Sequence, residues 1–211
     1  MSTEKYGIAK VVGGFGRSLS PEEAIPYTLA RTHIEHETIR RILSNRFSLH
    51  RRKKALEVGC GYGRNLPVLK EVFTQTFGLE RDEELATIAA NLHQDESATV
   101  VRMPKPLTRW PFDHGLFDFV MTFTVLQHLQ AFEFEFFISE INRVTGPNAT
   151  LLIVEETDET IVDPHTTGRS IETYKLLFSE FEFINSLPRK VEKTFPKEDS
   201  GAYMLFQKKK Q

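Results

Sequence analysis

The sequence predicts an α/β domain with seven strands in a mostly parallel sheet and helices on both faces. Between residues 55 and 154, short apolar segments rich in β-branched and aromatic residues alternate with segments of helical periodicity. This alternation is typical of a parallel sheet covered by crossover helices. After residue 180, two strand patterns are separated only by a polar loop, which indicates an antiparallel pair at the C-terminal edge of the sheet.

Length and composition narrow the class of protein. The 211 residues favour a single domain, and 40% hydrophobic with 27% charged residues exclude a wholly disordered chain. No run approaches the roughly 20 apolar residues that a membrane-spanning helix needs. The first ten residues lack the apolar stretch of a secretory signal, and Cys60 is the only cysteine, so we expect a cytoplasmic protein without disulfides. A net charge of -2 argues against nucleic acid as the substrate.

Residues 1–50 are predicted to form an N-terminal arm and a helical lid, and residues 51–211 to form the α/β domain. Ser20, followed by proline and two glutamates, is a helix-start signal. Apolar residues then recur near helical spacing to about Arg46. The chain outside this segment carries the strand patterns, so we treat the whole as one domain with an N-terminal addition.

Three possible metal ligands share one face of that helix. His33, His36 and Glu37 are spaced so that their side chains point the same way. Imidazole and carboxylate groups can ligate zinc, but a metal site needs more ligands than this helix offers. We therefore predict no metal site and interpret the helix as a cover for a ligand cleft.

The remaining strands and helices are predicted from short apolar runs and from apolar residues at helical spacing, respectively. Strands are predicted at residues 55–58, 74–79, 98–101, 117–123, 150–154, 181–187 and 202–207. Helices are predicted at residues 66–73, 82–93, 132–144 and 169–178, the second of them capped by Asp82. A turn is predicted at residues 145–149, where Gly, Pro and Asn follow one another.

A glycine-rich turn after the first strand carries the strongest functional signal. Gly59, Gly61 and Gly63 follow a buried strand directly and precede a helix, so backbone can approach a ligand there. Glu80 ends the next strand, 21 residues after Gly59 (80 minus 59), where open α/β sheets place a carboxylate for ribose hydroxyls. The two features favour an adenosine-type ligand. The glycine spacing differs from the G-x-G-x-x-G of dinucleotide binders, which disfavours a nicotinamide-dependent oxidoreductase.

In its ordered motifs the chain resembles the class I S-adenosylmethionine-dependent methyltransferase family. The resemblance implies a Rossmann-like fold, S-adenosylmethionine as cofactor, and a methyltransferase domain at residues 51–211. The motifs that carry it lie at residues 57–63, 78–80, 110–112, 117–120, 125–129, 140–144 and 151–153.

The resemblance also implies which residues bind the cofactor. They are Glu57, Gly59, Cys60, Gly61, Gly63, Glu80, Arg81, Met103, Thr124 and Val125. Glu57 would face the ammonium group, Glu80 the ribose diol, and Arg81 the adenine. The acid that the family often has after its third strand is missing here, so we expect Met103 to pack on the adenine instead. The two residues after the fourth strand would border the sulfonium.

Two histidines are candidates for a general base. His128 follows the fourth strand on the side of the ligand crevice, where it would either act as the base or pack against the cofactor. His165 lies in a polar loop after the fifth strand. With Arg169 and Tyr174 it could form a site for an anionic or hydroxylated acceptor. The same segment also fits a capped helix start with a solvated arginine.

We therefore predict transfer of a methyl group to an oxygen or nitrogen atom of a small or medium acceptor by in-line displacement, with oxygen favoured. The alternative is a non-catalytic module that senses the cofactor or binds a partner. Neither a membrane nor a nucleic acid is expected as a partner. Some phenylalanines of residues 132–137 could form a substrate wall or a homodimer contact, because one helix cannot bury all its faces.

Overall fold

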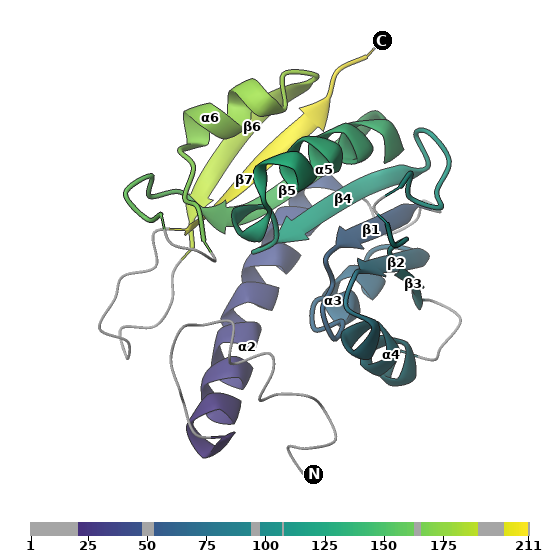
Figure 1. Ribbon diagram of the computed structural model, residues 1–211, viewed down its shortest axis with the longest axis vertical. Helices are drawn as coiled ribbons and strands as arrows, with labels where there is room; N and C mark the ends of the chain where they lie inside the picture. The colour runs from purple at the N-terminus through teal and green to yellow at the C-terminus, as the bar shows by residue number, and fades with distance from the viewer. Residues whose placement is uncertain are drawn as a thin grey trace.

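A seven-stranded sheet in the order β3-β2-β1-β4-β5-β7-β6 forms the centre of the molecule (Figure 1). The computed structural model describes residues 21–47, 53–93, 98–106, 108–162, 166–189 and 201–210, and only the backbone of residues 21–31. The strands are β1 (Lys54–Val58), β2 (Gln75–Glu80), β3 (Ala98–Arg102), β4 (Phe117–Phe123), β5 (Thr145–Glu156), β6 (Phe181–Pro188) and β7 (Gly201–Lys208). The helices are α2 (Pro21–Arg46), α3 (Leu66–Lys70), α4 (Glu83–Leu92), the 3-10 helix η2 (Leu126–His128), α5 (Ala131–Val144) and α6 (Ile171–Leu177).

Strand directions confirm the mixed sheet that the sequence predicts. Strands β3, β2, β1, β4 and β5 pair in parallel along the sheet. Strand β7 is antiparallel to both of its neighbours, β5 and β6. The chain order reverses between β1 and β4, because β1 leads outward to β2 while β4 leads to β5. In an open α/β sheet, ligands bind at the carboxyl ends of the strands beside such a reversal.

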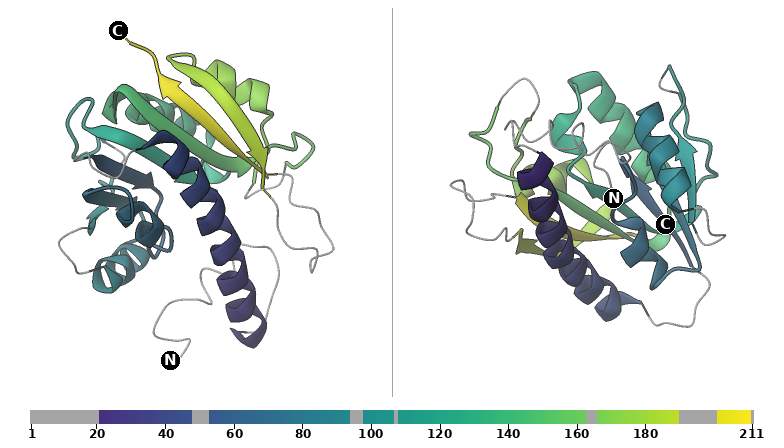
Figure 2. Two further views of the ribbon diagram at one scale, coloured as in Figure 1. Left: turned by 180° about the vertical axis from the view of Figure 1, so that it is seen from behind. Right: turned by 90° about the horizontal axis from the view of Figure 1, so that it is seen from below.

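Helices cover both faces of the sheet, as predicted. On one face α5 and α6 pack over the inner strands, with Ile141 and Tyr174 fully buried against residues such as Ile153 (Figure 1). On the other face α2 crosses the sheet, as the view from behind shows (Figure 2). There the apolar side chains of α2 and α3 contact the strand residues that point away from α5. Each strand of the centre is thus buried on both faces, which explains its continuous apolar sequence.

The helix predicted as a lid is in part a core helix. Ile39, Ile42 and Leu43, in the C-terminal half of α2, are at most 8% exposed and pack on the sheet. Their spacing of three to four residues places them on one side of the helix. Residues 1–20 and the side chains of residues 21–31 lie outside the described part, so the covering role of the arm stays a prediction.

The phenylalanines of α5 divide between core and surface. Phe134 and Phe137 are buried at 7% and 1% exposure. Phe136 is half-buried, with its ring centroid 6.3 Å from that of Trp110. Phe132 is 73% exposed. Most of this cluster is therefore core, and only Phe132 offers an open apolar surface for a partner.

The turn predicted at residues 145–149 is instead the beginning of β5. Thr145 already pairs with Phe117, and the register of β4 and β5 then shifts. Asn148 has a positive φ of 59° within this stretch. The residues that predict a turn therefore form a bulge inside a strand, because pairing with β4 starts before the bulge and resumes after it.

The other helices begin close to where the sequence places them. Asp82 caps α4 by accepting the N–H groups of Glu84 and Leu85 at 3.0 and 3.1 Å. Ser170 caps α6 in the same way through the N–H of Thr173 at 3.3 Å. Among the helices of the described residues, none combines the length and the apolar character that crossing a bilayer requires.

Candidate active site

The loop between β1 and α3 is a glycine-rich turn at the carboxyl edge of the sheet. Gly59, Gly61 and Gly63 have positive φ values of 68°, 57° and 81°, a region that L side chains rarely adopt. The N–H groups of Gly59 and Cys60 donate to the Leu79 carbonyl at 2.7 and 3.2 Å. These bonds tie the turn to β2. The turn therefore presents backbone, rather than side chains, to a ligand.

Glu57 supplies a buried carboxylate at the end of β1. The residue is 1% exposed, and its Oε1 accepts a hydrogen bond from Asn65 Nδ2 at 2.7 Å. Its Oε2 is also buried and has no hydrogen-bond partner. Burial raises the pKa of Glu57 to about 7, while the Asn65 hydrogen bond and the Arg64 charge act in the opposite direction. An unpartnered buried carboxylate oxygen fits the ammonium group of a ligand.

Glu80 is held rigidly at the end of β2. Its Oε2 accepts the N–H of Gly61 at 2.8 Å, and its Oε1 accepts the N–H of Asp82 at 2.8 Å. Each carboxylate oxygen can accept a further bond, so both remain able to receive hydroxyl groups. The carboxylate thus lies beside the glycine turn, and its ribose role stays a prediction.

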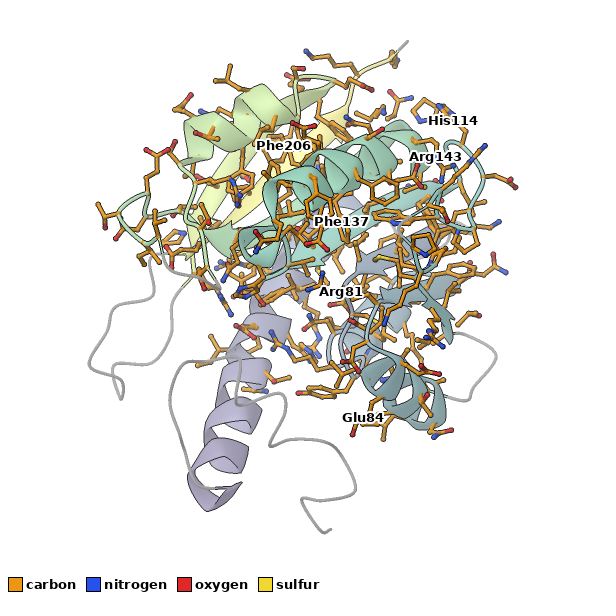
Figure 3. The ribbon with its side chains drawn as sticks, in the orientation of Figure 1. Arg81, Glu84, His114, Phe137, Arg143 and Phe206 are labelled. Carbon is orange, nitrogen blue, oxygen red and sulfur yellow. The ribbon has the colours of Figure 1, made fainter. Side chains whose placement is uncertain are left out.

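The residues assigned to the adenine side come from two neighbouring loops. Met103 is 2% exposed, and its N–H donates to the Glu80 carbonyl at 2.7 Å. Arg81 is half-exposed and pairs with Glu133 of α5 at 3.1 Å. Figure 3 shows Arg81 near the beginning of α5, at the opposite end of that helix from Arg143. The adenine roles of Met103 and Arg81 stay predictions.

The segment after β4 packs directly against the glycine turn. A Cβ added at Gly59 would lie 2.5 Å from Val125 Cγ2, so the two residues touch. Thr124 has a positive φ of 53°, which is rare for a β-branched residue. Its N–H donates to the Val154 carbonyl of β5 at 2.7 Å. The structure therefore brings Thr124 and Val125 to the same edge of the sheet as Glu57 and the turn.

Glu155 is a candidate that the sequence analysis missed. It lies at the end of β5 and is fully buried, and it accepts the backbone N–H groups of Val125, Leu126 and Gln127. Burial raises its pKa to about 7, against the effect of these hydrogen bonds. The available signal was a glutamate directly after an apolar strand, at the same edge as Glu57 and Glu80.

Of the residues predicted to act as base or to bind the acceptor, His128 and Arg169 lie around η2. His128 is half-buried, with its Nε2 3.3 Å from Gln127 Nε2. Arg169 Nη1 donates to the carbonyls of Leu126 and Thr167 at 3.2 Å each. Arg169 therefore holds this loop and is close to the predicted base. His165 lies outside the described residues.

Tyr174 lies deeper than a residue that binds the acceptor would normally lie. It is fully buried in α6, and burial, followed by the charge of Glu155, raises the pKa of its hydroxyl far above the usual value. Arg169 opposes this shift and stacks over Phe134 at 4.1 Å. Its role as a substrate residue stays a prediction.

Cys60 occupies the turn as a buried thiol. It is 4% exposed, and burial raises its pKa well above the ordinary value. A Cβ added at Gly78 would lie 2.6 Å from its sulfur, so β2 needs a glycine at this point. The thiol is protonated at neutral pH and packs the turn against β2.

A buried charge cluster connects α2 with the glycine turn. Glu35 of α2 is 1% exposed and pairs with Arg64, the residue after Gly63, and with Arg189. The guanidinium groups of the two arginines lie 4.7 and 4.9 Å from the ring centroid of Phe123. The end of β4, the turn and α2 are thus joined by one set of contacts.

The possible metal ligands of α2 do not form a cluster. His33 and Glu37 form an exposed pair at 3.3 Å. His36 points elsewhere, and its pKa is lowered by burial and by the charge of Arg64. Among the described residues, no three His, Cys, Asp or Glu side chains come together in a way that would hold a metal ion.

A groove of about 540 Å³ runs along α5, away from the glycine turn. It is lined by residues of α5 together with His114, Leu177, Glu180 and Lys208. Figure 3 shows His114 and Arg143 at the end of α5 that is far from Arg81. This groove shares no lining residue with the predicted cofactor site.

Comparisons with known proteins agree with this geometry. Residues 56–153 match the model of the methyltransferase domain family. No curated protein matches the sequence. Among solved structures, an S-adenosylmethionine-dependent methyltransferase from Methanosarcina mazei has a TM-score of 0.67 and 17% identity, with 81% of this chain and 98% of that chain covered.

Two further structures share the fold but carry different names. The carbon methyltransferase CurJ has a TM-score of 0.62 and 16% identity, with 85% of this chain and 54% of that chain covered. The [4+2]-cyclase SpnF has a TM-score of 0.64 and 15% identity, with 93% and 85% covered. The family match, the sheet order and the glycine turn with Glu57 and Glu80 together support a class I S-adenosylmethionine-dependent methyltransferase domain, with S-adenosylmethionine as its cofactor.

Proposed function

We propose that this chain transfers a methyl group from S-adenosylmethionine to an oxygen or nitrogen atom of a small or medium acceptor. The observation that supports this most is the buried Oε2 of Glu57, which has no partner and lies two residues before the turn. A cationic ligand group would satisfy this oxygen. Together with Glu80 at the end of β2, it gives one acidic group for the ammonium group and one for the ribose hydroxyls of an adenosyl amino acid.

The protein's own residues have limited chemistry to supply. The sulfonium of the bound cofactor provides an activated methyl group. Glu57 would bind its ammonium group and Glu80 its ribose hydroxyls, and the turn would accept the part between them. Thr124 and Val125 would border the methyl group from the end of β4. In-line displacement then requires mainly that the acceptor atom be oriented and that water be excluded.

A general base would help an oxygen acceptor. We propose His128 for this role, with His165 as the second candidate, because a histidine can take a proton near neutral pH. Arg169 is the acceptor-binding residue that we propose for the same side, since its guanidinium contacts the η2 loop. The acceptor is proposed to be a small molecule, and a homodimer contact would involve the exposed Phe132.

The second candidate function is cofactor binding without methyl transfer. The observation in its favour is that SpnF, whose name describes a [4+2]-cyclase, shares this fold over 93% of the present chain. Fold similarity at this level of identity does not fix the reaction. The two candidates differ in whether a labelled methyl group leaves the cofactor.

Calorimetry with the purified chain tests the cofactor first. We expect S-adenosylmethionine and S-adenosylhomocysteine to bind and NAD not to bind. Incubation with methyl-labelled cofactor and a panel of hydroxyl- and amine-bearing small molecules then tests transfer. Binding with no transfer to any acceptor would favour the cofactor-sensing alternative, and binding of NAD alone would contradict the proposal.

Glu80→Ala tests whether this binding uses the described site. The variant should weaken binding of S-adenosylmethionine by about 1–3 kcal/mol, because the ribose hydroxyls lose a charged acceptor. Glu182→Ala on β6 is the control, since Glu182 is exposed and far from the turn in the sheet order. Equal affinity of the two variants in calorimetry would remove Glu80 from the site.

A further inference from the structure

The carboxylate of Glu155 is surrounded by backbone donors from one short segment. Its Oε1 accepts the N–H groups of Val125 and Leu126, both at 3.1 Å, and its Oε2 accepts the N–H of Gln127 at 3.2 Å. The side chain is fully buried. Three consecutive amides therefore donate to one buried acid.

The loop returns hydrogen bonds to the strand that holds it. Gln127 Oε1 accepts the N–H of Glu156 at 2.8 Å, and the Gln127 carbonyl accepts the N–H of Thr167 at 2.8 Å. The N–H of Thr124 donates to the Val154 carbonyl. The segment from Thr124 to Gln127 is thus bonded to the end of β5 at each residue.

This loop has a conformation that needs such support. Thr124 has a φ of 53°, and a β-branched residue keeps such a strained conformation only where its surroundings impose it. Val125 touches Gly59, because a Cβ there would lie 2.5 Å from Val125 Cγ2. Any relaxation of the loop would therefore move the wall of the glycine turn.

We propose that Glu155 is a positioning residue for methyl transfer: its carboxylate fixes the backbone of residues 125–127, and so sets the distance between the end of β4 and the cofactor turn. This inference rests on the proposed function. It assigns Glu155 no contact with the cofactor or the acceptor. Its effect passes through Thr124 and Val125, which border the methyl group in that proposal.

The geometry calls for a carboxylate and not for an amide. A glutamine at this position would offer one oxygen acceptor, and its NH₂ group would face a backbone N–H that is itself a donor. One or two of the three amides would then lose their acceptor inside the protein. Glu155→Gln keeps the size of the side chain and removes the second acceptor.

Glu156→Gln is a matched control. The Oε1 of Glu156 accepts the N–H groups of Thr157 and Asp158, at 2.8 and 2.9 Å, and a glutamine oxygen can accept both. The change is chemically the same as Glu155→Gln and affects the next residue. It should leave affinity and turnover within twofold of the wild type.

The experiment compares wild type, Glu155→Gln and Glu156→Gln, each corrected for the folded fraction. It measures the affinity for S-adenosylmethionine, and kcat and KM for methyl transfer to an acceptor from the panel of hydroxyl- and amine-bearing small molecules. We expect Glu155→Gln to lower kcat by roughly 10–100-fold, since small misplacements of reacting groups cost up to about 10²-fold. Hydrogen exchange should show faster exchange of the Leu126 and Gln127 amides in this variant. If Glu155→Gln does not fold, Glu155→Asp replaces it, with a shorter carboxylate and a smaller expected loss.

Three results would overturn the inference, and they can be told apart. A wild type that binds no S-adenosylmethionine, or that transfers no methyl group, removes the proposed function and the positioning role with it. An active wild type with an equally active Glu155→Gln, per folded molecule, removes only the positioning role. A loss confined to stability, with kcat and KM unchanged, also assigns Glu155 to the fold alone.

Discussion

Glu57 is a buried acid whose charge depends on what lies beside it. Its pKa is raised to about 7 by burial, and the ordinary value is 4.5. The folded protein therefore keeps this proton between about pH 4.5 and 7, where an unfolded chain would release it. Stability from this group falls as pH rises through that window, because the unfolded state binds fewer protons there. A ligand cation at Oε2 would reverse the preference and draw the group to its ionised form.

Affinity for S-adenosylmethionine should consequently rise between pH 5.5 and 7. The ammonium group of the cofactor stays charged in this range, so Glu57 is the group that must lose a proton on binding. Arg64 favours the ionised form of Glu57, and Glu80 disfavours it. Calorimetry in buffers of different ionisation enthalpy should detect proton release on binding. The affinity, measured at several pH values, should rise by up to about tenfold per pH unit.

Glu57→Gln is the variant that checks this assignment. The amide keeps an oxygen near Asn65 but cannot titrate. We expect weaker binding that no longer changes over the same pH range. An unchanged pH slope in Glu57→Gln would show that a different group releases the proton.

The connections after β1, β2, β4 and β5 act as one unit. Each strand ends at the same edge, and the loops that follow them contact one another. Gly59 donates a hydrogen bond to the end of β2, Gly61 donates to Glu80, and the side chain of Val125 packs against Gly59. The glycines differ within this unit. Gly59 needs both its positive φ and the absence of a Cβ, whereas Gly61 needs only its positive φ, because nothing lies within 4 Å of an added Cβ.

Alanine substitutions in the turn should therefore differ in cost. Gly61→Ala should lower the free energy of unfolding by about 1–2 kcal/mol through backbone strain alone. Gly59→Ala should cost about 1–3 kcal/mol more, because its Cβ collides with Val125. Val125→Ala, introduced into the Gly59→Ala background, should restore part of that difference. Urea unfolding of the four proteins measures these values, and a double variant no more stable than Gly59→Ala would contradict the contact.

The features of this protein that can be predicted from its sequence are those whose contacts join residues close together in the chain. The glycine turn, Glu57 and Glu80 were predictable, because their roles follow from a local strand-turn-helix pattern and the end of the next strand. Glu155 was not, since its partners are 28–30 residues away and are backbone amides of any sequence. The bulge of β5 was missed because Gly, Pro and Asn favour turns and bulges for the same conformational reason.

The cluster around Glu35 is a second long-range example. Glu35 and Arg189 are 154 residues apart, and no local pattern marks either as buried. Arg189 donates to Glu35 Oε1 through Nε at 3.1 Å and Nη2 at 2.7 Å, and Arg64 donates to Oε2. One carboxylate thus joins α2, the glycine turn and the segment after β6. Its charge offsets that of two guanidinium groups, of which Arg189 is 6% exposed.

Removing the charge of Glu35 should lower the free energy of unfolding of the whole protein. Glu35→Gln leaves two guanidinium groups without their counter-charge, which costs about 3–5 kcal/mol for a buried pair. Glu37→Gln on the same helix should change the free energy of unfolding by less than about 0.5 kcal/mol, because Glu37 and its partner His33 are 63% and 74% exposed. Urea unfolding followed by circular dichroism measures both. Equal midpoints for the two variants would mean that α2 stays on the sheet through its apolar residues alone, with Ile39 and Leu43 sufficient to hold it beside the turn.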